Sequence, residues 1–434
     1  MPEDRNPVLQ FLAVTGDRGI VVEHRKELTY LLCQAAELEH SLMAQYLFAA
    51  FSLRSEVGPG LTEAQLEAVE RWRSVILAIS AEEMLHWALV QNLLIAVGSA
   101  PYVSRPHMPH QAKGYPPGIQ LRLLPFGAPA LQHFVYLERP EGMDMSDGEG
   151  FVPTGPIPQP MAPGELQPRG QDFTTQGYLY RAIEEGIVGL ADRTGEDRLF
   201  IGPRFHQTDA PHVWPELVPI TDVASARRTI ERIVEQGEGA RGDWETAHYG
   251  RFLAVLEEYQ ELRAADPSFE AAHNTVAAGV RGVEGVEPDV FIKDPVTAAV
   301  SDVFNAVYDV LLQMIARYFA FGHETDEQRH ILADVGITLM FVAIKPLGLL
   351  LARMPVGPDT PEIAAGANFQ LAYRASFLLP HRRSAWIRFA ERLDEIADAT
   401  DAIAADVDGA KVLDAVAGNV REASRRLAEN IEPV

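Results

Sequence analysis

Two stretches of the sequence place a glutamate and a histidine three residues apart in apolar surroundings. Glu83 and His86 occur in VILAISAEEMLHWALVQNLLIAV, and Glu245 and His248 occur in DWETAHYGRFLAVLEEY. Residues three apart on a helix lie on the same side, so each pair can bind one ion. A structural Glu–His hydrogen bond is the alternative for either pair alone. Because a buried carboxylate is costly unless it is paired or bound to a metal, we predict that both pairs face an interior site.

Two other segments with helical periodicity supply one acid each. Along residues 26–55, apolar positions recur at steps of three and four, and Glu39 lies on the same face. Residues 174–192 offer Glu184, and its neighbour Glu185 is the competing choice because the flanking pattern there is weak. The order along the chain is therefore single acid, Glu-x-x-His, single acid, Glu-x-x-His, which chance rarely produces.

This ordered set is the ligand arrangement of di-iron and di-manganese carboxylate bundles, in which all ligands project inward. Four carboxylates balance the charge of two divalent cations, and neutral histidine ligands suit iron rather than magnesium or calcium. We therefore predict a site for two iron ions, with manganese as the alternative metal. Its predicted ligands are Glu39, Glu83, His86, Glu184, Glu245 and His248.

Two tyrosines share the predicted inward faces with the single acids. Tyr46 lies two turns after Glu39, and Tyr180 lies four residues before Glu184. We expect both to act at the site, as hydrogen-bond donors to the ligands or in electron relay. Tyr249 is a further candidate, and ordinary core packing is the alternative for all three.

The elements that must position these residues define an all-α fold. Helices are predicted at residues 26–55, 62–98, 174–192 and 241–264. A Pro- and Gly-rich stretch at about 99–173 separates the second helix from the third, and its segment LQHFVYLE is interpreted as a short strand or extended piece. One long crossover of this kind is typical of ferritin-like four-helix bundles. We predict such a bundle over residues 1–265, with a further helical region, residues 266–434, packed on it.

Composition limits the partners and the location. The net charge of −24 argues against nucleic acid or an anionic membrane as a partner. The run GITLMFVAIKPLGLLLARM is short for a membrane span and is broken by Lys345-Pro346, so we predict a buried, kinked helix there. The single cysteine, Cys33, and an N-terminus without a signal-peptide pattern favour the cytoplasm. The apolar C-terminal helices would suit a homodimer.

The motifs also carry a family resemblance. EHSLMAQYLFAA and EEMLHWA resemble the first-helix and second-helix metal-ligand motifs of bacterioferritins, which favours Glu39 over Glu37 or His40. Over residues 25–380 the chain resembles the ferritin-like domain of iminophenyl-pyruvate dimer synthases, enzymes of bisindole pathways. The matching segments include ELEHSLMAQYL, AEEMLHWALVQNLLIAVG, YLYRAIEEGI and ETAHYGRFL.

Motifs and resemblance together predict an enzyme. The leading hypothesis is a di-iron oxidase or oxygenase that uses O2 to act on a small, amino-acid-derived substrate in specialised metabolism. The first alternative, implied by the resemblance, is a coupling enzyme similar to iminophenyl-pyruvate dimer synthase. The second is an iron-binding or ferroxidase protein without an organic substrate.

Overall fold

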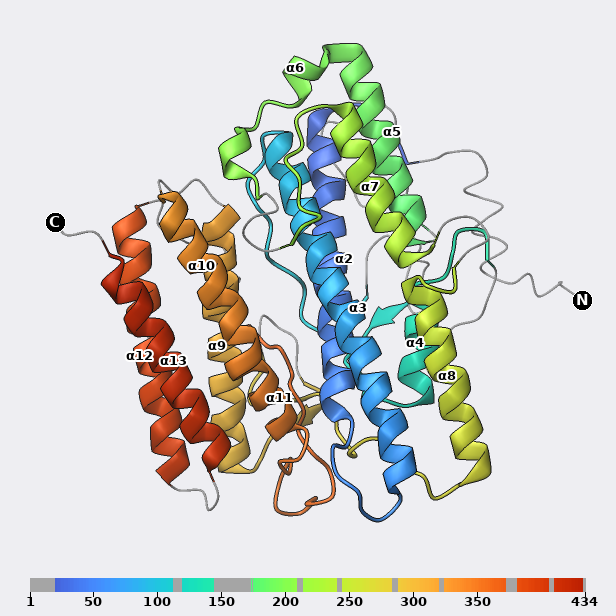
Figure 1. Cartoon of the computed structure of the whole chain (residues 1–434), viewed down its shortest axis with the longest axis vertical. Coiled ribbons are helices and arrows are strands. Elements are labelled where there is room, and N and C mark those ends of the chain that lie inside the picture. Colours follow the sequence, from blue (N-terminus) through green and yellow to red (C-terminus); the bar gives the residue numbers. More distant parts are fainter. Residues whose placement is uncertain are drawn as a thin grey trace, which may run out of the picture.

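Two long helices form the centre of the molecule. In the computed structural model, α2 (Arg25–Ser52) and α3 (Glu63–Ala96) pack against each other along most of their length (Figure 1). α3 begins directly after Thr62, whose hydroxyl accepts from Gln65 N while the Gln65 side chain accepts from Thr62 N.

The described residues are 20–111, 119–143, 173, 175–208, 214–239, 244–282, 288–319, 324–371, 381–405 and 410–431.

The third and fourth positions of the bundle are each filled by two shorter helices. The third consists of α4 (Ala128–Leu137) and α5 (Gln176–Thr194), and the fourth of α7 (Val223–Gly237) and α8 (His248–Ala265). α4 packs on α8, and α5 packs on α7 (Figure 1). The end of α4 meets the start of α5, where Gln176 Nε2 donates to the Leu137 carbonyl at 3.2 Å. Both bundle positions are therefore interrupted midway along α2 and α3.

Two predictions about these elements are wrong. LQHFVYLE belongs to α4 rather than to a strand, and the helix predicted at 241–264 begins only at His248. α4 is buried on nearly all sides, so its sequence lacks the alternation of apolar and polar residues that marks a surface helix. Packing of α4 against α8 outweighs the local sequence preference and makes the segment a helix. Pro129 in the first turn is compatible with a helix start.

The C-terminal helices form a layer beside the bundle (Figure 1). They are α9 (Pro295–Phe319), α10 (Asp326–Leu339), a π-helical turn (Met340–Ile344), α11 (Lys345–Leu351), α12 (Arg382–Ala405) and α13 (Lys411–Glu429). The hairpin of α12 and α13 packs on α9 and α10, and α11 packs on α2. The predicted irregularity at Lys345-Pro346 is confirmed, since the helix passes through the π turn immediately before Pro346, which lacks an N–H. We propose residue 265 as the domain boundary.

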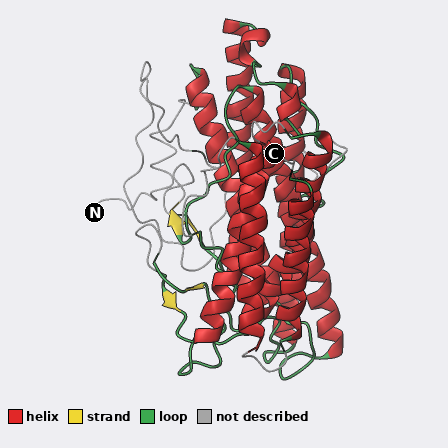
Figure 2. Cartoon of the chain, turned by 90° about the vertical axis from the view of Figure 1, so that its left-hand side faces the viewer, coloured by secondary structure: helices red, strands yellow, loops and turns green. Residues whose placement is uncertain are grey.

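The remaining elements are short. They comprise α6 (Glu196–Leu199), a 3₁₀ turn (Arg204–His206), and strands β1 (His110–Gln111), β2 (Gln120–Leu121), β3 (Ala278–Gly279) and β4 (Val290–Phe291). β1 pairs antiparallel with β2, and β3 pairs parallel with β4. Figure 2 shows these strands to one side of the helices, which run side by side along the long axis.

Two stretches among the described residues are long and apolar enough to cross a membrane by length and composition. They are Pro295–Phe319 and Asp326–Leu351, and 56% and 44% of their most apolar windows are buried inside the molecule. Helices in the core of a soluble protein meet the same criterion, so this observation is weak evidence for a membrane span.

Candidate metal centre

Five buried side chains converge where the third and fourth bundle helices are interrupted. Glu39 comes from α2, Glu83 and His86 come from α3, Glu138 follows the last residue of α4, and His248 is the first residue of α8. Each is at most 1% exposed. The fold thus collects three carboxylates and two imidazoles from four helices into one interior cluster, called the centre below.

Glu83 lies between the two histidines and offers one oxygen to each. Its Oε2 is 3.1 Å from His86 Nδ1, and its Oε1 is 3.0 Å from His248 Nδ1. The two imidazole rings are stacked with centroids 5.3 Å apart. Glu39 Oε2 lies 3.7 Å from His86 Nδ1, and Glu138 Oε2 lies 3.6 Å from His248 Nδ1. The centre therefore has two similar halves that share Glu83.

Two tyrosines hold the outer carboxylates. Tyr180 OH donates to Glu39 Oε1, and Tyr46 OH donates to Glu138 Oε1. Both tyrosines are buried, and in each carboxylate the second oxygen faces the histidine of the same half. Tyr46 and Tyr180 therefore both contact the cluster, Tyr180 through the predicted ligand Glu39 and Tyr46 through Glu138.

The outer nitrogens of both histidines have their own partners. His248 Nε2 donates to Glu82 Oε2 at 2.8 Å, and Glu82 is also paired with Arg251. His86 Nε2 donates to Gln236 Oε1 at 3.1 Å. A carboxylate or amide acceptor at one ring nitrogen fixes the ring and leaves the other nitrogen to bind a metal. Both Nδ1 atoms therefore face the centre as potential ligands.

The donor atoms fit a metal. Within the described part of the chain, four buried atoms of the centre make no hydrogen bond: Glu39 Oε2, Glu83 Oε1, Glu138 Oε2 and His248 Nδ1. Buried polar atoms are nearly always satisfied, and leaving one unsatisfied costs about 1–3 kcal/mol. One ligand atom from each of Glu83, His86 and His248 lies within 4.8 Å of the other two, close enough to hold one ion. Carboxylate oxygens and neutral imidazoles are the donors that suit iron, manganese and zinc.

The pKa values show which protons a cation would replace. Burial raises the pKa of Glu39 to about 7, and the charge of Glu83 adds to the shift. Burial alone would lower the pKa of His86, but the adjacent carboxylates of Glu39 and Glu83 outweigh it and raise the pKa to about 9. The same balance raises the pKa of His248 well above its usual value, mainly through the charge of Glu83. Protons on the histidines therefore balance the carboxylates until a cation displaces them.

Two predicted ligands, and the alternative to one of them, lie outside the centre. Glu184 is on the outer side of α5, where its Oε1 accepts from Arg227 Nε at 2.6 Å, and the alternative Glu185 is exposed. Glu245 is exposed in the turn before α8, so it does not share a helical face with His248. The predicted inward positions of Glu184 and Glu245 are therefore wrong. The interruptions of the bundle are the reason. They place Glu138, which precedes α5, and His248, which begins α8, at the level of Glu39.

Sequence reasoning missed Glu138 and Glu82. Glu138 follows Phe134 and Leu131 at steps of four and three, so the helical spacing is present in LQHFVYLE but is too short to distinguish from a strand. Glu82 precedes Glu83 and does not share its helical face, but His248 of α8 contacts it there. This contact joins residues 166 positions apart, and only the tertiary structure reveals it.

An all-α bundle with an interior cluster of carboxylates and histidines defines a class of metal-carboxylate helical proteins. Residues 32–257, more than half of the chain, match the family model described as ferritin-like. The chain belongs to the ferritin-like family.

Two curated relatives are enzymes. The chain is 27% identical over 404 residues to dichlorochromopyrrolate synthase of Lentzea aerocolonigenes, covering 83% of this chain and 37% of that protein. It is 28% identical over 365 residues to 2-imino-3-(indol-3-yl)propanoate dimerase of Chromobacterium violaceum, covering 77% of this chain and 33% of that protein. The chain therefore spans about a third of the length of these relatives.

Among solved structures, a ferritin-like protein from Caulobacter vibrioides is similar to this chain. The match is 18% identical, has a TM-score of 0.46, and covers 74% of this chain and 96% of that one.

Proposed function

We propose that the centre binds two divalent metal ions, iron or alternatively manganese, and that the protein is an O2-dependent oxidoreductase acting on a small, amino-acid-derived molecule. The observation that carries the proposal is the pair of similar halves, each with one carboxylate, one histidine and one tyrosine, joined by Glu83. A single ion bound by Glu83, His86 and His248 would leave Glu39 and Glu138 without a metal, whereas two ions would use all three inward carboxylates. We also propose a cytoplasmic location and a homodimer.

The charge of the centre favours an anionic substrate. Three inward carboxylates carry three negative charges, whereas two divalent ions carry four positive charges, and the histidines bind as neutral ligands. One positive charge remains, in contrast to the neutral cluster predicted from four carboxylates. Glu82 lies behind His248 and offsets part of it. A substrate carboxylate, which amino acids and their imino and keto acids all carry, would complete the balance.

The chain's own residues would fix and enclose the metal ligands. Tyr180 and Tyr46 orient the outer carboxylates, and Glu82 and Gln236 orient the histidines. Burial of all five central residues keeps bulk water from the reacting groups. Ferrous ions bound here would supply the electrons that reduce dioxygen.

A second candidate function rests on the curated relatives. Their names describe the synthesis of a chromopyrrolate and the dimerisation of an indolyl imine. Our chain would then couple two imine molecules, and the centre would have a structural role. A third candidate, iron oxidation without an organic substrate, is supported by family membership alone.

The experiment that tests the proposal follows oxygen consumption by protein loaded anaerobically with ferrous iron. Amino acids and the matching keto acids are added one at a time, and products are identified by mass spectrometry. We expect one substrate to stimulate O2 uptake and to be oxidised by the wild type and by Glu184→Ala, but not by Glu83→Ala. Dimer formation by metal-free protein without O2 uptake would instead establish the coupling function. Uptake with iron alone and no organic product would establish iron oxidation.

A further inference from the structure

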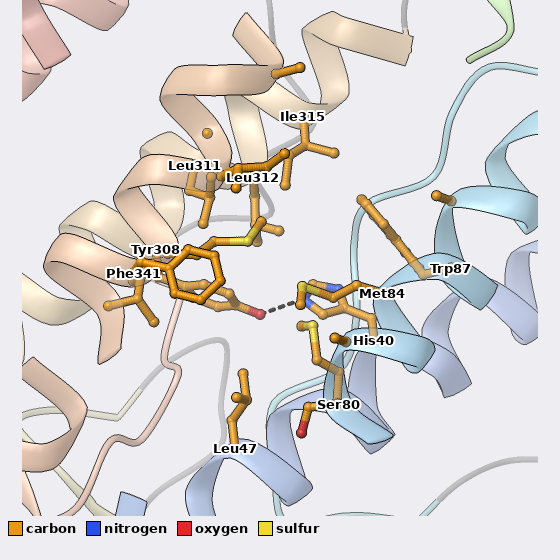
Figure 3. A pocket seen from close by; sticks show the side chains of 18 of the residues that line it. His40, Leu47, Ser80, Met84, Trp87, Tyr308, Leu311, Leu312, Ile315 and Phe341 are labelled. Atoms are coloured by element: carbon orange, nitrogen blue, oxygen red, sulfur yellow. Dashed lines mark hydrogen bonds between the residues drawn. The ribbon is translucent and has the colours of Figure 1, made fainter. Parts of the chain in front are cut away.

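A cavity of about 210 Å³ lies between the bundle and the C-terminal layer (Figure 3). Side chains of α2 and α3, among them His40, Met84 and Trp87, face side chains of α9 across it, among them Leu312 and Ile315. His40 follows Glu39 directly, and Met84 follows Glu83, and consecutive helical residues point about 100° apart, so the cavity faces a different side of these two helices from the centre. It is a separate feature of the molecule, and no step of the proposed oxidation uses it.

The cavity is apolar, rich in aromatic rings and open to the surface. Its aromatic and methionine lining is Met43, Phe51, Met84, Trp87, Trp214, Tyr308, Tyr318, Phe319, Met340, Phe341 and Phe369. Phe341 is 64% exposed, so the cavity reaches the surface beside the π turn. A ligand can therefore enter without unfolding of the layer.

Among the residues that the structure describes, no charged group reaches the interior of the cavity. Lys345 is the one lysine, arginine, aspartate or glutamate among the lining residues. Because the surface of the cavity is almost entirely apolar, Lys345 contributes the aliphatic part of its side chain to the wall. His40 Nδ1 donates to the Val103 carbonyl at 3.1 Å, and its Nε2 forms a hydrogen bond with Tyr308 OH, so both ring nitrogens already have partners. An ionic ligand would lose its hydration without compensation.

Two buried polar atoms on the lining residues lack a partner. Trp87 Nε1 and Thr208 Oγ1 make no hydrogen bond within the described part of the chain, and these residues are 8% and 0% exposed. A tryptophan N–H can only donate, whereas a hydroxyl can donate or accept. A ligand with one hydroxyl or similar group can satisfy at least one of them.

We propose that this cavity is a binding site for an uncharged, two-ring aromatic molecule that carries one polar group. The volume sets the size, since an engineered apolar cavity of roughly 150 Å³ takes up benzene and a cavity of 210 Å³ has room for a second fused ring. The aromatic walls suit a flat ring, and the methionines adapt to its outline. The site does not depend on the metal centre or on its proposed chemistry.

Gly336 of α10 offers a way to fill the cavity. It is one of the lining residues, and a Cβ added there would meet its nearest neighbour, Leu311 Cδ1, at 3.5 Å, which is ordinary contact. Gly336→Leu should therefore fold and project its side chain into the space. Gly418 of α13 is the matched control, because it is an exposed helical glycine with nothing within 4 Å of an added Cβ.

Calorimetric titration of the full chain with 2-naphthol tests the proposal. We expect one molecule to bind per chain in the wild type, in Gly418→Leu, and in Glu83→Ala, which alters only the centre. Gly336→Leu should weaken binding at least tenfold while keeping its helical circular dichroism. Thr208→Val should weaken the binding of 2-naphthol several-fold but leave that of naphthalene unchanged.

Several results would overturn the proposal. They are the absence of 2-naphthol binding to the wild type, unchanged binding by Gly336→Leu, and loss of binding in Glu83→Ala, which would place the ligand at the centre. Equal affinity for the anion 2-naphthoate would contradict the uncharged class. If 2-naphthol binding weakens as protein concentration rises, and sedimentation detects a dimer, a second copy rather than a ligand covers the opening.

Discussion

Glu138 Oε2 lies 3.6 Å from His248 Nδ1, although one residue directly follows α4 and the other begins α8. The interruptions in the third and fourth bundle positions produce this contact. An uninterrupted helix would carry its ligands in its interior turns, as α3 does with Glu83 and His86. Here two helix ends meet instead, and both residues are almost fully buried. Five predictions follow from this arrangement and from its surroundings.

Removal of the Glu138 carboxylate should empty half of the centre. Glu138→Gln keeps the size of the side chain but removes the charge that faces His248, so we expect about one metal ion fewer per chain than in the wild type. Elemental analysis after ferrous loading measures the ratio. Glu184→Gln is the matched control, because Glu184 is paired with Arg227 outside the centre. Loss of metal in the control and not in Glu138→Gln would restore the ligand set predicted from the sequence.

Glu82 should act through His248. Glu82→Gln weakens the acceptor at His248 Nε2, and loss of such a partner typically lowers metal affinity about 10–100-fold. Competition with a chelator measures the affinity, and the spectrum of the cobalt-substituted protein reports on the geometry of the bound ion. Glu245→Gln, an exposed change three residues before His248, should alter neither quantity. Equal affinities in the wild type and Glu82→Gln would show that other contacts hold the ring.

Metal uptake should depend on pH through the histidines. The pKa of His86 is raised to about 9 in the metal-free centre, so below pH 9 a cation must displace its proton. Glu39, with a pKa of about 7, adds a second proton to displace below pH 7. Apparent affinity should therefore rise with pH between pH 6 and 9, accompanied by proton release in weakly buffered solution. Constant affinity between pH 6 and 9 would contradict the protonated metal-free centre.

Loss of the Tyr46 hydroxyl should leave a buried carboxylate oxygen without its donor. Tyr46→Phe keeps the ring against Phe134 and Phe252 but removes the bond to Glu138 Oε1, and we expect a loss of about 1–3 kcal/mol in the free energy of unfolding. Chemical denaturation of metal-loaded protein measures it. Tyr249→Phe is the control, since the Tyr249 ring packs on Trp244 and should lose less than about 0.5 kcal/mol.

The contact between the C-terminal layer and the bundle should be sensitive to one methyl group. A Cβ on Gly348 of α11 would approach the Phe51 ring of α2 to 2.4 Å, so Gly348→Ala should destabilise the protein by about 1–3 kcal/mol. Gly418→Ala meets no atom within 4 Å and should stabilise α13 by up to about 1 kcal/mol. Thermal unfolding compares the stability of the two variants. Similar stability of both would mean that α11 can shift away from Phe51 without destabilising the protein.

Much of the fold follows from the sequence. The long helices α2 and α3 were predicted within three residues at each end, because their apolar positions recur at helical spacing over many turns. Asp294, an aspartate directly before Pro295, is a typical helix start and caps α9, accepting from Thr297 N at 2.8 Å. The same spacing identified Glu39, Glu83 and His86, and His248 was found because an apolar face follows it along α8.

The sequence alone determined that this chain forms a helical bundle with a buried Glu and His cluster, because periodicity and the cost of burying charge are local properties. Only the tertiary structure decided that Glu138 rather than Glu184 completes it, and that Glu82 supports His248. Those positions depend on where two helices stop and on which ends meet across the bundle. α4 is buried on nearly every side, so its ten residues do not alternate between apolar and polar at helical spacing. Its helical conformation therefore cannot be predicted from its own sequence.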